Sequence, residues 1–152
     1  MSVDYYLEIA ASSNAKQILD LICNKSNIEK IDKKTFALPG LCGYVLETGD
    51  RIKSLVKDEF GFYPTVNISF VPMFQSDESI QGRRSIIKIS MLVLNYEIGD
   101  AVLSREYEQI LFYRLNGKLV LNSKYFTSDS IFERTEDINL PYSIEDIKSS
   151  WL

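Results

Sequence analysis

The sequence predicts an α+β fold: a single domain in which a mainly antiparallel sheet packs against about three helices. Two observations predict it. Strand-like runs recur along the chain and several are joined by short turns, as in antiparallel sheets. Three other stretches repeat apolar residues at helical spacing. With 45% hydrophobic and 25% charged residues, residues 1–152 are expected to form one such domain with a sizeable core.

The strongest local signal is Asn116-Gly117, which separates two strand-like runs, 109–115 and 118–122. A two-residue turn of type I′ needs a positive φ at both central residues, and Asn followed by Gly adopts it at the lowest cost. We therefore predict a hairpin, and the turn fixes its register. The expected pairs are Leu115 with Lys118, Tyr113 with Val120, and Phe112 with Leu121.

Both faces of this hairpin carry large apolar side chains. A strand pair that is apolar on both sides is stable when both sides are covered. We therefore expect the hairpin to lie inside the sheet and under other elements. By simple alternation, one face holds Ile110, Phe112, Leu119 and Leu121, and the other holds Leu111, Tyr113, Leu115 and Val120.

The N-terminal half shows one period-two run, one helical run and two short strand-like runs. The helix needs a short polar side chain at its start, which accepts from the free first-turn amides. The expected elements are a half-buried strand over 3–9, a helix capped by Ser12 or Ser13 with an apolar stripe of Ala15, Ile18, Leu19 and Ile22, a polar connection over 24–34, and strands over 35–38 and 43–47 around Pro39-Gly40.

Gly and Pro mark the ends of the elements that follow. Gly61 can adopt the left-handed conformation that ends a helix, and Pro72 ends a strand. The expected elements are a helix that begins at Asp50 as its N-cap, a strand over 65–71, an exposed loop over 75–84, a helix over 84–97 closed by Gly99, and a strand over 100–103. After residue 122 we expect one helical turn from Ser128 or Asp129, and a Trp151 side chain that docks onto the body of the domain.

The net charge of −4 is unevenly distributed. Up to Ser128, fifteen acids balance fifteen bases, so the whole net charge resides in the last stretch. Such a stretch would favour a basic partner, and it also fits a solvated tail that aids solubility. Its acids are Asp129, Glu133, Glu136, Asp137, Glu145 and Asp146, against Arg134 and Lys148.

The chain lacks the residues that most catalytic sites need. It has no histidine, which excludes Ser-His-Asp and Cys-His sites and removes the usual general base. Cys23 and Cys42 do not have the spacing of a zinc site, and no phosphate-binding glycine motif occurs. Adjacent acids such as Glu136-Asp137 point away from each other on a regular element. We therefore predict no catalytic residue, no cofactor and no metal.

Partners of other classes are also disfavoured. The basic doublets Lys33-Lys34 and Arg83-Arg84 are isolated and lack an aromatic platform, so nucleic-acid binding is not expected. The longest wholly apolar run, Met91–Leu94, is far too short to cross a membrane. The chain starts without the basic and apolar regions of a signal peptide, so we expect a cytoplasmic protein with reduced thiols.

A set of turn glycines and strand patterns resembles a known family through most of the chain. It includes the strand Tyr5–Ala10, Phe60-Gly61 before Pro64-Thr65-Val66, Ser69-Phe70, Gly99-Asp100-Ala101-Val102-Leu103, a glutamate at Glu106 or Glu108, Arg114, and Gly117–Asn122. These motifs resemble the Sit-type swarming-inhibition immunity family, third class, among the bacterial toxin-immunity proteins. The tail departs from the family pattern, since Tyr125-Phe126 stands where the family has a tryptophan.

The resemblance implies a cytoplasmic, non-catalytic protein that binds and neutralises a cognate toxin delivered by neighbouring cells in contact-dependent inhibition. Such inhibition needs only a complementary surface. A basic nuclease would suit the acidic last stretch. Residues expected to contact the toxin are Asp129, Phe132, Glu133, Glu136, Asp137, Tyr142, Glu145 and Asp146. Two alternatives stay open: a non-enzymatic adaptor or regulatory subunit of a housekeeping protein, and an enzyme with a carboxylate site.

Overall fold

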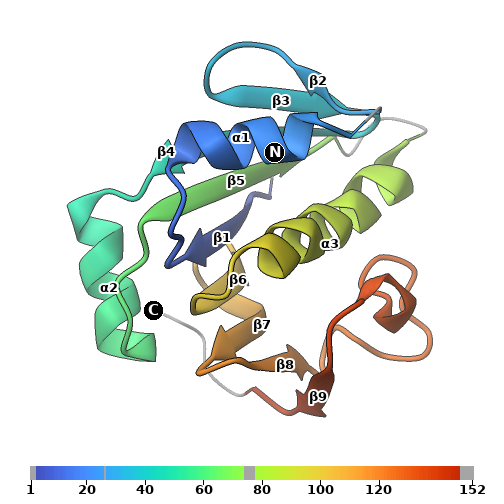
Figure 1. Cartoon of the computed structure of the whole chain (residues 1–152). Coiled ribbons are helices and arrows are strands. Elements are labelled where there is room, and N and C mark those ends of the chain that lie inside the picture. The colour runs from blue at the N-terminus through green and yellow to red at the C-terminus, as the bar shows by residue number, and fades with distance from the viewer. Residues whose placement is uncertain (1–2, 26, 74–77, 148–152) are drawn as a thin grey trace.

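The structure is a computed structural model that describes residues 3–25, 27–73 and 78–147. These residues form one nine-stranded sheet and three α-helices (Figure 1). The strand order is β2-β3-β4-β5-β1-β6-β7-β8-β9, and all neighbours are antiparallel except the parallel pair β8 and β9. The α+β prediction is therefore confirmed.

The elements have the following bounds. The strands are β1 (Tyr5–Ile9), β2 (Glu29–Lys30), β3 (Thr35–Leu38), β4 (Leu41–Glu47), β5 (Val66–Pro72), β6 (Ala101–Arg105), β7 (Gln109–Leu115), β8 (Lys118–Asn122) and β9 (Tyr142–Glu145). The helices are α1 (Ala15–Cys23), α2 (Asp50–Phe60) and α3 (Ser79–Tyr96), with a 3₁₀ turn at Thr135–Asp137.

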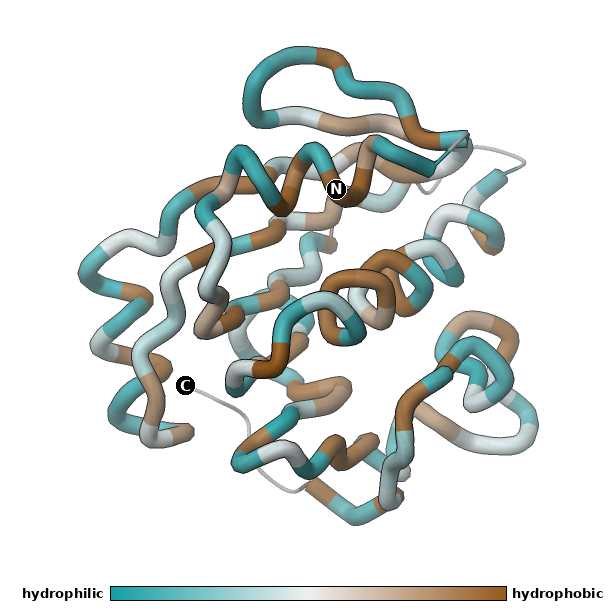
Figure 2. Tube along the Cα trace, in the orientation of Figure 1, coloured by the Kyte–Doolittle hydropathy of each residue, from teal (hydrophilic) through white to brown (hydrophobic). Residues whose placement is uncertain are grey.

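The main core lies between one face of the sheet and the helices α1 and α3, which lie side by side over it (Figure 1). Ile18, Leu19 and Ile22 of the α1 stripe are fully buried, as the helical spacing predicts. Hydrophobic colour concentrates along α3 and the strands behind it, whereas β2 and the turn that joins it to β3 are largely hydrophilic (Figure 2). Burial of this apolar surface is the main stabilising contribution.

The opposite face of the sheet is only partly covered. There, Val56 of α2 packs with Phe62, Val102 and Ile110 in a smaller apolar cluster. In Figure 1, α2 lies at one end of the sheet, past the point where β4 ends. Within the described residues, no helix covers the β3–β4–β5–β1 part of this face.

The β7–β8 hairpin has the predicted register, including Tyr113 opposite Val120. Asn116 and Gly117 both have positive φ (52° and 80°), as a type I′ turn requires. The prediction for the faces was wrong at two positions. A register shift where β7 meets β6 leaves Leu111 as an extra residue, so Leu111 joins the main core and Ile110 joins the α2 cluster.

The expected exposed loop over 75–84 is wrong from residue 79 onward, and residues 75–77 lie outside the described residues. α3 begins at Ser79, and Gly82 near its start lets the helix backbone approach Gly40 in the β3–β4 turn. A Cβ on either glycine would meet the backbone of this contact well inside van der Waals distance. Gly82 therefore supports a close helix-to-turn packing instead of interrupting the helix.

The helix termini partly differ from the expected caps. Asn14, not Ser12 or Ser13, caps α1: its side chain accepts from the Gln17 N–H at 2.9 Å, and the Gln17 side chain accepts from the Asn14 N–H. α2 has Gly49 as its N-cap and ends at Gly61 with φ 83°, as expected for that glycine. α3 ends at Tyr96, before Gly99.

Arg114, one of the residues in the family pattern, holds the α3–β6 connection. Its guanidinium is buried and donates to the carbonyl oxygens of Leu94 (2.7 Å), Glu97 (2.6 Å) and Gly99 (2.7 Å). These carbonyls lie in the last turn of α3 or just after it, where backbone acceptors lack helical partners. Arg114 is therefore a structural residue of the scaffold.

Two strands and one turn were not predicted correctly. β2 lies in the stretch expected to be an irregular connection, and β9 follows Pro141 and is exposed throughout. The helical turn expected from Ser128 or Asp129 is absent, and a 3₁₀ turn forms at Thr135–Asp137 instead. Trp151 lies outside the described residues. Among the helices described, none combines the length and apolar character that crossing a bilayer demands.

Candidate protein-binding surface

One patch of the uncovered sheet face exposes large side chains that usually pack against another element. Cross-strand pairing places Tyr44 of β4, Ser69 of β5 and Tyr6 of β1 in one row. Tyr44 is 40% exposed, whereas Val45, which points to the helix-covered face, is 2% exposed. We call this patch the open face; its residues are Tyr6, Cys42, Tyr44, Leu46, Ser69 and Val71.

Tyr6 is held in place by a second tyrosine from the β6–β7 turn. The rings of Tyr6 and Tyr107 stack with centroids 4.1 Å apart and planes 8° apart. Tyr107 and its neighbour Glu106 both have φ of 57°, a left-handed conformation that is uncommon for residues other than glycine. The tight turn thus folds the Tyr107 ring back over β1, where it covers the strand residue next to Tyr6 along this face.

That residue is Glu8, which is completely buried in the middle of the sheet. Its carboxylate accepts from the Tyr107 hydroxyl at 2.8 Å, from the Thr48 hydroxyl at 3.2 Å and from the side-chain amide of Asn67. Burial raises the pKa of Glu8 to about 7, although the three donors lower it. Ser69 of the open face donates to the other end of the Asn67 amide at 2.8 Å, so this buried network orients the strands beneath the open face.

The edge of the open face near Tyr6 is acidic. Burial and, after it, the nearby carboxylates of Asp4 and Glu106 together raise the pKa of the Tyr6 hydroxyl to about 12. The Glu106 carboxylate accepts from the backbone N–H of Asp4 at 2.6 Å, which keeps both acids beside the tyrosine. One buried carboxylate oxygen of Asp4 has no hydrogen-bond partner within the described residues. This edge therefore presents negative charge to an approaching molecule.

The arrangement fits protein binding better than catalysis. Exposed tyrosines on a rigid strand surface are common anchors of protein interfaces. Glu8 carries an unusual pKa, but its carboxylate has no exposed surface for a substrate to reach. Across the described ranges, no group of three or more Cys, Asp or Glu side chains is placed to hold a metal ion.

The structure divides the residues that the sequence suggested for toxin contact. Phe132, Glu133 and Asp137 come together against the first half of α3. Arg83 lies over the Phe132 ring at 3.7 Å and its guanidinium is 3.6 Å from the Glu133 carboxylate, which is buried. Arg84 binds Asp137 at 2.9 Å and Glu136 at 3.2 Å.

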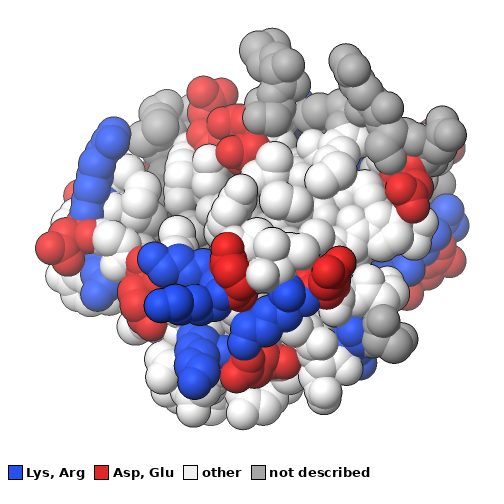
Figure 3. Space-filling model, turned by 90° about the horizontal axis from the view of Figure 1, so that it is seen from above, with Lys and Arg blue, Asp and Glu red and all other residues white. Residues whose placement is uncertain are grey.

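The remaining members of that set lie apart from this cluster and are exposed: Asp129, Tyr142, Glu145 and Asp146. Tyr142 and Glu145 belong to the strand β9. The acidic stretch is thus partly neutralised by internal ion pairs. Charges of both signs are also interspersed on the face seen from above in Figure 3. Elsewhere in the described residues, Lys30 of β2 pairs with Asp20 of α1 at 3.0 Å.

The open face was missed by reasoning from the sequence. The alternation in β1 marks Tyr6 and Glu8 as the exposed side of a half-buried strand. It does not reveal that Glu8 is buried beneath Tyr107, which is distant in the sequence. The available signal was Tyr6 itself, a large aromatic side chain at a polar position of a strand.

A scan against protein-family models matches residues 3–130 to the family described as SitI3-like. The match confirms the resemblance that the sequence motifs suggested. It spans β1 to β8, including every residue of the open face, and leaves out all of the suggested contact residues except Asp129. The search of curated proteins and the search of solved structures returned no match.

Proposed function

Because the chain belongs to the SitI3-like family, we propose that it is an immunity protein that binds a cognate toxin and neutralises it without catalysis. The family name points to an immunity protein. The proposal adds that the toxin comes from a neighbouring cell and that the complex forms in the cytoplasm. Such a protein works by occluding the toxin, which requires a specific surface and no reactive group.

The open face is the observation that supports this proposal most directly. It combines Tyr6 and Tyr44 with a rigid sheet, so few side-chain degrees of freedom are lost on binding. The carboxylates of Asp4 and Glu106 border it, which favours a basic partner and speeds the encounter. A nuclease has a basic phosphate-binding surface and would satisfy this requirement.

The exposed part of the acidic C-terminal stretch is a second contact region under this proposal. Tyr142, Glu145 and Asp146 are accessible and would add negative charge at the far edge of the sheet. Arg83 and Arg84 contact the other suggested residues of this stretch, which are Phe132, Glu133, Glu136 and Asp137. These residues would affect toxin binding indirectly, by fixing the conformation of the segment.

The first test is co-expression of the protein with the product of the adjacent upstream gene, and its readout is the rescue of cells from killing. The second test measures the affinity of the protein for the toxin's terminal domain. Tyr44→Ala should weaken binding about tenfold or more, because Tyr44 would be a central anchor. Tyr96→Ala is the matched control, since Tyr96 is 60% exposed and ends α3, outside the open face.

A Glu145→Lys, Asp146→Lys double variant tests the second region, and we expect it to slow association and reduce its salt dependence. Unchanged affinity in Tyr44→Ala would reject the open face as the contact surface. Failure of the protein to rescue cells or to bind the toxin domain, with capture of a housekeeping protein instead, would favour an adaptor.

A further inference from the structure

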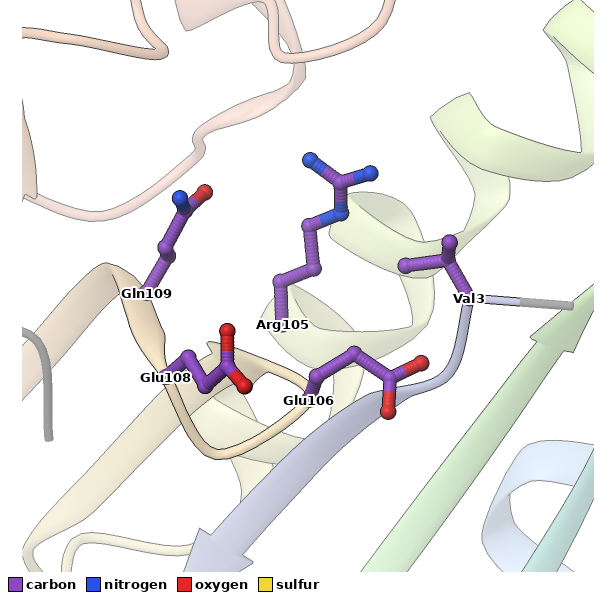
Figure 4. Close-up of a pocket in the computed structure, with 5 residues that line it drawn as sticks. All are labelled: Val3, Arg105, Glu106, Glu108 and Gln109. Carbon is purple, nitrogen blue, oxygen red and sulfur yellow. The ribbon is translucent and has the colours of Figure 1, made fainter. Parts of the chain in front are cut away.

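A cavity of about 260 Å³ lies on the sheet face opposite to the open face, at the β6–β7 turn. Figure 4 shows Arg105 and Gln109 pointing side by side into it. Val3, Glu106 and Glu108 complete the lining. Arg105 pairs across the sheet with Tyr5, and Gln109 pairs with Arg105, so these side chains emerge on the same face of the sheet.

One hydrogen-bond donor group in the cavity wall lacks an acceptor, and a second such group lies outside the lining. Within the part of the chain that the structure describes, the Arg105 guanidinium forms no hydrogen bond and no ion pair. Nearby, the Nε–H of Arg83 is buried and also has no acceptor among the described residues. Since buried or half-buried guanidinium groups are normally paired, these donors indicate a missing acceptor.

The local charge agrees with a missing anion. Burial raises the pKa of the Glu133 carboxyl, and both Arg83 and Arg105 oppose that rise, so two cations face one carboxylate. Burial raises the pKa of the Tyr5 and Tyr125 hydroxyls, and Arg105 opposes this rise. The positive charge of Arg105 is therefore directed towards the interior region that holds Glu133, Tyr5 and Tyr125. Arg83 and Arg105 against Glu133 leave one positive charge in excess on this interior side, while the other two carboxylates of the lining, Glu106 and Glu108, are exposed.

We propose that this cavity binds one carboxylate group, held by the planar fork of Arg105 and the side-chain amide of Gln109. The carbonyl end of Gln109 accepts from the Tyr125 hydroxyl, which leaves its amide N–H groups to donate to the ligand. A guanidinium and a carboxylate match as two parallel hydrogen bonds.

A carboxylate fits better than a phosphate because the rim of the cavity is acidic. Glu106 turns away to accept from the Asp4 backbone (Figure 4), but Glu108 is exposed beside Arg105 and repels added negative charge. A dianionic phosphate group would suffer this repulsion about twice as strongly as a carboxylate. The carboxylate has two sources: a free small acid, or an acidic side chain of a protein partner.

The site can be tested by NMR on the full chain labelled with ¹⁵N, using the singly charged monomethyl ester of glutarate, called glutarate below, as the free carboxylate. We expect saturable shifts confined to the Gln109 side-chain amide, the Arg105 Nε–H and the β6–β7 turn. Arg105→Gln should weaken binding about tenfold or more, and Glu108→Gln should strengthen it by removing the competing charge. Arg51→Gln on α2 is the matched control and should bind as the wild type does.

Sodium phosphate at the same ionic strength should bind more weakly than glutarate. Shifts that do not saturate, or that are the same in Arg105→Gln, would overturn the proposal, and the amide spectrum of each variant shows that it is folded.

A separate experiment distinguishes the two sources of the carboxylate. If a partner supplies the carboxylate, Arg105→Gln weakens binding of the toxin domain and that domain displaces glutarate; if a free acid supplies it, toxin affinity does not change. The glutarate result is independent of the toxin, so this proposal can fail while the proposed function holds.

Discussion

Replacing Glu8 by Gln should remove a pH dependence from the stability of the protein. The pKa of Glu8 is about 7 in the folded chain, against an ordinary value of 4.5. The folded state therefore binds the proton more tightly than the unfolded state, and its stability falls as pH rises from about 4.5 to about 7. The difference of these two pKa values, at about 1.4 kcal/mol per pH unit, amounts to about 3 kcal/mol.

Glutamine preserves the shape of this site and cannot ionise. Its amide oxygen can accept from Tyr107 and Asn67, and its amide nitrogen can donate to the Thr48 hydroxyl oxygen. The variant and the wild type should therefore have similar stability below about pH 4.5, where Glu8 is neutral in both states. Above about pH 7 the variant should be more stable by about 3 kcal/mol.

The assay is urea unfolding followed by circular dichroism at a series of pH values on both proteins. The difference between the two free energies of unfolding isolates Glu8, because Glu133, whose pKa is also raised by burial, is present in both. Glu59→Gln, which removes an exposed carboxylate of α2, is the control for the loss of a charge. A Glu8→Gln difference that is constant across this pH range would refute the reasoning about the buried network.

Three further substitutions test the scaffold by urea unfolding. Gly82→Ala should cost about 2 kcal/mol, because the added Cβ would meet the Gly40 backbone, whereas Gly49→Ala should cost less, since nothing lies within 4 Å of that position and only the preference of the α2 N-cap for glycine over alanine is lost. Equal costs would contradict the close packing. Arg114→Met should cost about 3 kcal/mol, because it leaves carbonyl oxygens at the end of α3 without donors; a loss below about 1 kcal/mol would mean that water replaces it. Asn14→Ala should cost about 1 kcal/mol through loss of the capping box, and an unchanged stability would show that the cap is dispensable.

Local chemistry made much of the fold predictable. The Asn116-Gly117 turn needs only its own residues to choose a type I′ conformation, so the register of β7 and β8 followed from it. The stripe of α1 and the stop at Gly61 are likewise local properties. The errors arose where distant segments decide. The extra residue Leu111 depends on how β6 pairs with β7, and a pattern of alternation does not reveal it.

The proposed binding surfaces and one close packing contact were less predictable than the rest of the fold. Gly82 resembled a loop residue because its partner, Gly40, is distant in the sequence. The acids of the last stretch looked like a free tail, since nothing in the order of residues indicates that Arg83 and Arg84 engage them. The open face depends on which half of the sheet remains uncovered, a property of the assembled tertiary structure.

The central claim is that the chain acts by binding and does not act by catalysis. The measurement that tests it most directly is a titration of the activity of the purified toxin domain with increasing amounts of the purified protein. Inhibition that is complete at equimolar protein, with both molecules recovered intact in one complex, is the predicted result. Complete and lasting inactivation of the toxin by a small fraction of an equivalent would show turnover and would contradict the account.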